Sequence, residues 1–122
     1  MNKLFAPSGY WQLTQEAKDR ICNGMGAKDS ALAKLIPNTM YGLDVTEVGN
    51  IHDYMYHVGL DLADKEEADR VFLNNLVRII NNEGGWLAFF RRRRALKYYE
   101  AVHHFGGPAF WANKNSLQEL TA

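Results

Sequence analysis

The sequence has few of the features that mark secreted or membrane-spanning proteins. Its 122 residues include one cysteine, Cys22, so no disulfide can form within the chain, and the fold must rest on packing or bound ions. No segment approaches the run of about 18 apolar residues typical of a transmembrane helix. The first residues do not read as a signal peptide. We therefore expect a cytoplasmic protein, or one released by a non-classical route or by a phage.

The chain also lacks net charge. Fourteen Lys and Arg residues balance fourteen Asp and Glu residues, so there is no general attraction to nucleic acid, and any such binding would need a local patch. The four histidines and the single cysteine do not have the spacing of zinc ligands. With 47% hydrophobic and 23% charged residues, the chain has the composition of an ordinary globular protein. Its length suits a single domain, residues 1–122.

The hydrophobic pattern predicts helices joined by glycine-rich segments, with no internal repeat and no segment that alternates like a strand. The sequences DVTE (44–47) and DKEE (64–67) are capping boxes, which predict Asp44 and Asp64 as the N-caps of two helices. The fold class expected is therefore all-α. We expect helices at 9–21 (capped by Ser8), 44–59, 64–81 and 86–104, a loop at 22–30, a short helical stretch at 31–36, a stop at GGP (106–108) and a loosely held tail at 112–122.

The stretch NIHDYMYHVG, residues 50–59, places polar residues on a core-facing helix. His52 shares a stripe with Val48 and Met55, so its ring should face the core. Tyr56 lies one turn later on the same side, and Asp53 lies about 100° round, at the edge of that face.

The following helix also carries a polar residue on its apolar face, because Asp69 shares a stripe with Phe72 and Leu76. A buried carboxylate is costly unless it is paired. The short loop at about 59–63 favours an antiparallel hairpin. At about 1.5 Å per residue, His52 and Asp69 both lie roughly 8–9 Å from the turn. We therefore expect a hydrogen bond between them, which would fix the imidazole tautomer and raise its basicity.

HDYMY resembles the H-D-x-x-Y signature of secreted-type phospholipases A2, and ADRVFLNNL resembles the downstream helix that supplies a second aspartate in that family. The spacing is closest to the short bacterial and fungal members, and the resemblance covers about residues 22–80. It implies an antiparallel helix hairpin that hydrolyses phospholipid esters with calcium. His52 would take a proton from water and Asp69 would orient it. Tyr56 would support the pair, and Asp53 would bind calcium.

The resemblance also implies a glycine-rich loop whose carbonyl oxygens complete the calcium shell. NGMGAKD (23–29) is one candidate, because Gly24 and Gly26 allow the backbone to turn its oxygens inward, and Asp29 could add a carboxylate. NTMYGLD (38–44) is the rival, because it lies closer to the helix. The cysteines that staple this loop in animal members are absent.

Four consecutive arginines stand at 91–94, after Trp86, Phe89 and Phe90. Four helical residues cover about 300° of azimuth, so at least one must lie along the core edge, pair with an acid or reach a ligand. Basic residues beside aromatic ones fit a membrane interface or a lipid headgroup. Nucleic-acid phosphate is the less favoured partner. The candidate lipid- or anion-binding residues are Trp86, Arg91, Arg92, Arg93 and Arg94.

A second function is compatible with the same residues. In a non-catalytic interaction module, the His–Asp pair would be a polar network of the core. The arginines would then bind a partner such as nucleic acid, an anionic surface or a larger, phage-associated assembly.

Overall fold

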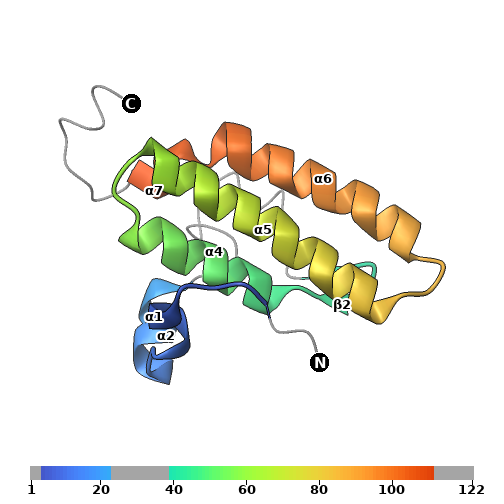
Figure 1. Ribbon diagram of the computed structural model, residues 1–122, viewed down its shortest axis with the longest axis horizontal. Helices are drawn as coiled ribbons and strands as arrows, with labels where there is room; N and C mark the ends of the chain where they lie inside the picture. Colours follow the sequence, from blue (N-terminus) through green and yellow to red (C-terminus); the bar gives the residue numbers. More distant parts are fainter. Residues whose placement is uncertain (1–3, 23–38, 112–122) are drawn as a thin grey trace.

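The computed structural model describes residues 4–22 and 39–111, and three long helices dominate it (Figure 1). The described residues are mainly helical, which confirms the all-α class. None of the described helices is long and apolar enough to cross a membrane. The elements are α1 (Ser8–Trp11), α2 (Gln15–Ile21), β1 (Thr39–Met40), β2 (Leu43–Asp44), α4 (Thr46–Val58), α5 (Leu62–Glu83), α6 (Ala88–Phe105) and α7 (Gly107–Trp111).

The first predicted helix, 9–21, is in fact two short helices. Thr14 interrupts it, because its hydroxyl accepts a hydrogen bond from the backbone N–H of Ala17 at 3.1 Å and so caps α2. Ser8 is the first residue of α1 rather than its cap. The predicted loop at 22–30 (beyond Cys22), the helical stretch at 31–36 and the tail at 112–122 lie outside the described residues.

A small antiparallel hairpin, which the sequence pattern did not predict, precedes α4. Thr39 pairs with Asp44 and Met40 with Leu43. Tyr41 and Gly42 form its two-residue turn with φ values of 51° and 80°, the left-handed conformation that such tight hairpins require. Strands of two residues are too short to show an alternating pattern, so only the structure reveals them.

The N-terminus of α4 differs in detail from the predicted capping box. The helix begins at Thr46, after Val45, and the Asp44 carboxylate accepts from the Thr46 N–H at 2.9 Å. Glu47 forms an ion pair with Lys18 of α2 at 3.3 Å. Asp44 therefore ends the β-hairpin and assists the helix start, without being the N-cap.

The N-cap of α5 is Asp61, so the predicted cap, Asp64, is wrong by three residues. The Asp64 N–H donates to the Asp61 carboxylate at 2.9 Å, and the Leu60 N–H donates to the Asp64 carboxylate at 2.8 Å. Asp61 and Asp64 both fit the capping pattern, and the helix begins after the earlier one, Asp61. As a result, the connection between α4 and α5 is only 59–61.

The C-terminal helices also shift slightly. α6 runs over Ala88–Phe105 rather than 86–104, and the GGP sequence ends it as predicted. The chain then re-enters a helix, α7, which the pattern did not predict. Pro108 is compatible with it because the first turn of a helix needs no N–H donor from proline.

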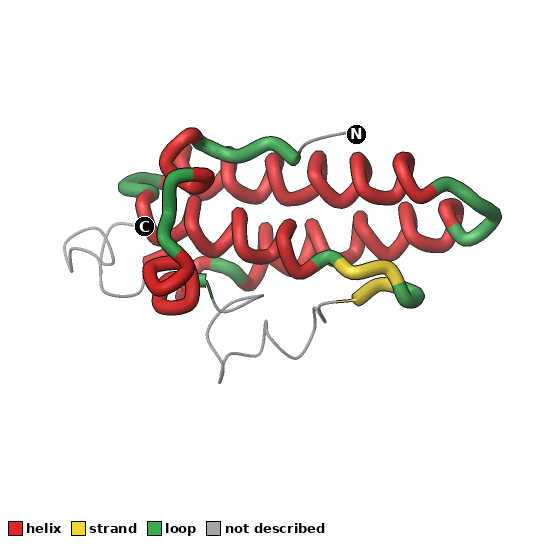
Figure 2. Tube along the Cα trace, turned by 90° about the horizontal axis from the view of Figure 1, so that it is seen from below, coloured by secondary structure: helices red, strands yellow, loops and turns green. Residues whose placement is uncertain are grey.

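Helix α5 lies between α4 and α6 and shares the main core with both (Figure 1). The tube view shows the N-terminal segment along one side of the helices and the β-hairpin on the other (Figure 2). A smaller cluster, Tyr56, Ala68 and Phe110, joins α4 and α5 to α7. The main core comprises Met40, Val45, Val48, Phe72, Leu76, Ile80, Ala88, Ala95, Tyr98 and Val102.

Candidate active site

The antiparallel α4–α5 hairpin brings His52 and Asp69 together, as expected. The His52 Nε2 atom lies 2.8 Å from Asp69 Oδ1, and both side chains are buried, with 2% of His52 exposed. The short connection at 59–61 sets the two residues at the same height on neighbouring helices. The predicted hydrogen bond is confirmed.

Tyr56 joins this pair from one turn further along α4. Its hydroxyl donates to the same Asp69 oxygen at 2.7 Å, and its ring centre lies 4.1 Å from that of His52. The Phe72 ring also contacts the imidazole, at 5.0 Å between centres. Gly106, at the end of α6, touches the Tyr56 hydroxyl so closely that an added Cβ atom would clash with it. Aromatic contacts and the α6 terminus thus fix the imidazole and the phenol in place.

Lys65 completes the network and was missed by the sequence analysis. Its ammonium donates to Asp69 Oδ2 at 2.8 Å, and to the carbonyl oxygens of Val102 and His103 at 3.2 and 3.3 Å. It is buried and lies one turn before Asp69 on α5. That i, i+4 spacing is a signal that could have revealed it. The carbonyl groups belong to the last turn of α6, the end of a helix that favours a positive charge.

These contacts determine the protonation states of His52, Tyr56 and Asp69. Burial opposes the charge on Asp69, but hydrogen bonds from His52, Lys65 and Tyr56 outweigh it and lower the pKa of the carboxyl group. For His52, burial lowers the pKa and outweighs the opposing effect of Asp69. Burial and the charge of Asp69 raise the pKa of Tyr56. The arrangement is therefore a neutral imidazole and a neutral phenol on an ionised carboxylate. The expected gain in basicity from Asp69 is real but smaller than the effect of burial.

The lowered pKa of His52 predicts a loss of stability in mild acid. In the unfolded chain the imidazole takes up a proton near its ordinary pKa of 6.5, whereas in the folded protein it does so only at lower pH. The unfolded state therefore binds more protons as the pH falls below 6.5, and the free energy of unfolding decreases.

Urea unfolding at about pH 7 and about pH 5.5 measures this dependence, since the free energy follows from the transition midpoint. The decrease should be smaller in His52→Gln, which cannot take up the proton. His57→Gln removes an exposed histidine from the same helix and should behave like the wild type. An unchanged pH dependence in His52→Gln would show that burial of His52 is not its source.

Asp53 follows His52 on α4 and lies beside the end of α2. The Cys22 thiol donates to the Asn50 carbonyl oxygen at 3.3 Å, and burial together with the charge of Asp53 raises the pKa of Cys22 to about 11. The charge of Asp53 thus acts on Cys22, the residue just before the candidate calcium loop at 23–29. Gly24, Gly26 and Asp29 of that loop lie outside the described residues.

Within the described part of the chain, Asp53 is the carboxylate of this site that could serve as an oxygen ligand of a hard cation. No group of three or more His, Cys, Asp or Glu residues among residues 4–22 and 39–111 could hold a metal ion. The rival loop, 38–44, is a poorer candidate, because the carbonyl oxygens of Met40 and Tyr41 already accept hydrogen bonds from Arg91 at 3.2 and 2.6 Å.

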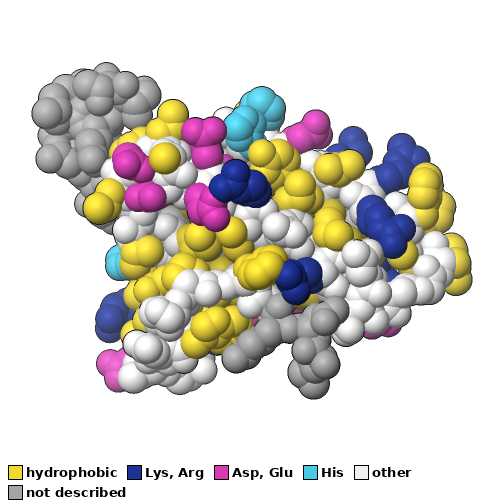
Figure 3. Space-filling model, viewed as in Figure 1, with side chains coloured by type: hydrophobic (Ala, Val, Ile, Leu, Met, Phe, Trp, Pro, Cys, Tyr) yellow, Lys and Arg dark blue, Asp and Glu magenta, His cyan; other side chains and the backbone are white. Residues whose placement is uncertain are grey.

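The four arginines separate into two kinds. Arg91 is buried and holds the β-hairpin, which confirms that at least one of the run lies against the core. It is therefore committed to a structural contact and is not available to a lipid. Arg92, Arg93 and Arg94 are exposed, and Trp86 is 79% exposed. Figure 3 shows dark blue basic side chains among yellow hydrophobic ones at this end of the molecule, on the right of the view.

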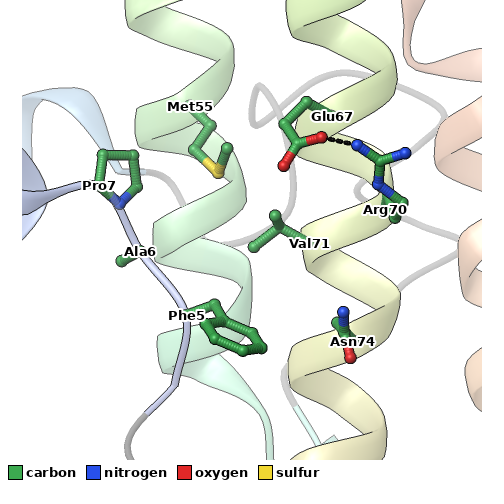
Figure 4. A pocket seen from close by; sticks show the side chains of 8 residues that line it. All are labelled: Phe5, Ala6, Pro7, Met55, Glu67, Arg70, Val71 and Asn74. Atoms are coloured by element: carbon green, nitrogen blue, oxygen red, sulfur yellow. Dashed lines mark hydrogen bonds and ion pairs between the residues drawn. The ribbon is translucent and has the colours of Figure 1, made fainter.

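A cavity of about 490 Å³ lies beside the α4–α5 helix hairpin. His52 and Asp69 do not line it. Figure 4 shows the N-terminal segment forming one wall, with α4 and α5 forming the other. Asn75 anchors this segment, because its side chain exchanges hydrogen bonds of 2.7 and 2.8 Å with the Phe5 backbone. The cavity is lined by Phe5, Ala6, Pro7, Met55, Glu67, Arg70, Val71 and Asn74.

No protein-family model matches the chain, and no match was found among curated proteins or solved structures.

Proposed function

We propose that the protein is a calcium-dependent, phospholipase A2-like hydrolase of phospholipid ester bonds. One observation carries the proposal: His52 Nε2 lies 2.8 Å from the buried Asp69 carboxylate, which also accepts from Tyr56. With Nε2–H donating to Asp69, the lone pair of the imidazole is on Nδ1. A neutral imidazole held in one tautomer can act as a general base at neutral pH.

In the proposed reaction, His52 Nδ1 takes a proton from water as the water oxygen bonds to the ester carbonyl carbon. The ionised Asp69 stabilises the imidazolium that forms, and Tyr56 keeps the carboxylate in position. When the ester C–O bond breaks, the imidazolium returns its proton to the leaving alkoxide. The products are a fatty acid and a lysophospholipid, and His52 is neutral again.

Asp53 is the residue of this site that would hold calcium. Its carboxylate is an oxygen ligand of the kind that calcium prefers, and its charge acts on Cys22, the residue before the candidate loop. When bound, calcium would polarise the ester carbonyl and bind the phosphate. The remaining ligands proposed, from 23–29, lie outside the described residues.

The test is fatty-acid release from mixed anionic and zwitterionic vesicles, with calcium or with a chelator. We expect His52→Ala to reduce the rate by about 10²–10⁴-fold, the usual contribution of a general base. The exposed His57→Ala on the same helix should keep the wild-type rate. Calcium should also raise the melting temperature of the wild type, by binding the folded state, and should do so less for Asp53→Asn.

Release that persists in His52→Ala would contradict the assigned base. Absence of release from the folded wild type, with no effect of calcium on melting, would contradict the hydrolase.

A second function, a non-catalytic interaction module, is favoured by the Lys65 contacts. Lys65 neutralises the charge of Asp69, and the imidazole is almost fully buried. A polar network in which every member is satisfied can serve simply to fix the packing of a core. On this view the vesicles would remain intact, and the exposed arginines would carry the function.

A further inference from the structure

Large apolar rings are exposed where α5 turns into α6. Trp86, Phe89 and Phe90 are 79%, 59% and 43% exposed, and Tyr41 of the β-hairpin is 46% exposed. Phe90 is the centre of the group, with its ring 6.4 Å from Trp86, 5.4 Å from Phe89 and 6.4 Å from Tyr41. Contiguous apolar surface of this kind marks an interaction site more often than scattered exposed residues do.

Two structural features assemble this cluster. Gly84 and Gly85 adopt φ values of 68° and 82°, a conformation that other residues rarely adopt, and so turn the chain sharply after α5. Arg91 then binds the Met40 and Tyr41 carbonyl oxygens and holds the β-hairpin against α6. This contact holds the Tyr41 backbone near α6, and Arg94 donates to the Tyr41 hydroxyl at 3.1 Å, so Tyr41 lies beside Phe90.

The same end of the molecule carries a concentrated positive charge. The sixteen residues from Gly84 to Tyr99 include five basic residues and no acidic one, although the whole chain is neutral. The Arg93 guanidinium lies 5.8 Å from the centre of the Phe89 ring, and that of Arg94 lies 5.3 Å from the Tyr41 ring. Basic and aromatic side chains therefore share one surface. On the right of Figure 3, basic side chains lie among hydrophobic ones.

We propose that the aromatic and basic surface at the turn between α5 and α6 docks on an anionic phospholipid surface. Rings of this kind enter the boundary between headgroups and acyl chains to a depth of about 5–10 Å, while arginines further along the helix pair with lipid phosphates. The surface consists of Tyr41, Trp86, Phe89, Phe90, Arg92, Arg93 and Arg94.

The ring geometry favours lipid over single-stranded nucleic acid. Proteins that bind single strands offer exposed faces of aromatic rings, on which successive bases stack. Here Phe90 meets Trp86 and Phe89 edge-on, at 90° and 82° between planes. The cluster is a compact apolar knob rather than a row of parallel platforms. The inference builds on the proposed function by naming the surface that would bring the hydrolase to its substrate, but binding itself requires no turnover.

The experiment measures binding to vesicles of ether-linked lipids, which have no ester bond to hydrolyse. Phosphatidylcholine vesicles are compared with vesicles that also contain phosphatidylglycerol, by sedimentation and tryptophan fluorescence. We expect binding that prefers the anionic vesicles. The double variant Arg92→Gln/Arg93→Gln should lower the partition coefficient about 30-fold, at about 1 kcal/mol for each arginine.

The aromatic contribution is tested at Trp86. Trp86→Ser should weaken binding about tenfold or more, because a large ring no longer enters the apolar layer. Trp86→Phe should keep most of the binding and lose part of the fluorescence blue shift. The matched control, Leu60→Ser/Leu62→Ser, removes exposed apolar side chains from the α4–α5 connection and the first residue of α5, at the other end of that helix, and should bind like the wild type.

Equal binding to both kinds of vesicle, or an equal loss in the leucine control, would overturn the proposal. Binding to a single-stranded oligonucleotide that depends on Arg92 and Arg93, without binding to vesicles, would also overturn it and assign the surface to nucleic acid. Because the ether lipids cannot be cleaved, a failure here is distinct from a failure of the hydrolase assay, which reports on His52.

Discussion

Asp69→Asn is expected to lower the free energy of unfolding by about 3–5 kcal/mol, the usual cost of breaking a buried ion pair from one side. The substitution removes the charge that compensates the buried Lys65 ammonium, which lies 2.8 Å away. It also replaces an acceptor-only group that binds His52 and Tyr56. Since small domains are stable by about 5–15 kcal/mol, this loss would be a large share of the total. Urea unfolding followed by circular dichroism measures it.

The matched experiment is a double-mutant cycle with Lys65→Met. Each single variant strands one buried charge, but Lys65→Met/Asp69→Asn strands none, so the double variant should be more stable than the sum of the two losses implies. Additive losses would mean that the two side chains do not act as a pair. For the proposed hydrolase, the double variant should recover stability without recovering activity, because no carboxylate orients His52. Asp69 thus supports both the fold and the proposed chemistry.

Arg91→Leu is expected to destabilise the protein by about 3 kcal/mol, since hydrogen bonds to a charged group are each worth about 1.5–3 kcal/mol. The buried guanidinium binds two carbonyl oxygens of the β-hairpin, which a leucine would leave without these donors. The Arg93 side chain, two residues further along, is exposed, so Arg93→Leu should change stability by only about 0.5 kcal/mol. The two variants remove the same chemical group from the same helix, so thermal and urea unfolding isolate the effect of position.

Similar losses in Arg91→Leu and Arg93→Leu would contradict the division of the arginine run into one structural and three surface residues. A selective loss in Arg91→Leu would support it. It would also predict that vesicle binding weakens in this variant, because the backbone contact that holds Tyr41 near Phe90 would be lost.

Much of the candidate site was predictable because its geometry is local. The helical period puts His52 and Tyr56 on one face of α4, and the same period puts Asp69 on the inner face of α5. A short connection forces the two helices to run antiparallel, so equal distances from the turn bring His52 and Asp69 together. The error in the α5 cap did not disturb this result, because it shortened the connection without rotating either face.

Other features were decided only by the docking of α6 and the β-hairpin. Lys65 binds the Val102 carbonyl across 37 residues of sequence, and Arg91 binds that of Met40 across 51. Gly106 is required by a Tyr56 hydroxyl that lies 50 residues earlier. No periodic pattern encodes such contacts, since each depends on where one helix end meets another element in space. The sequence by itself determined the three long helices and the facing of His52 and Asp69, because short-range periodicity and a short loop control both. The tertiary structure decided that Asp69 is neutralised by Lys65, and that Arg91 is a core residue while its three neighbours remain at the surface, because burial at those positions depends on the packing of distant segments.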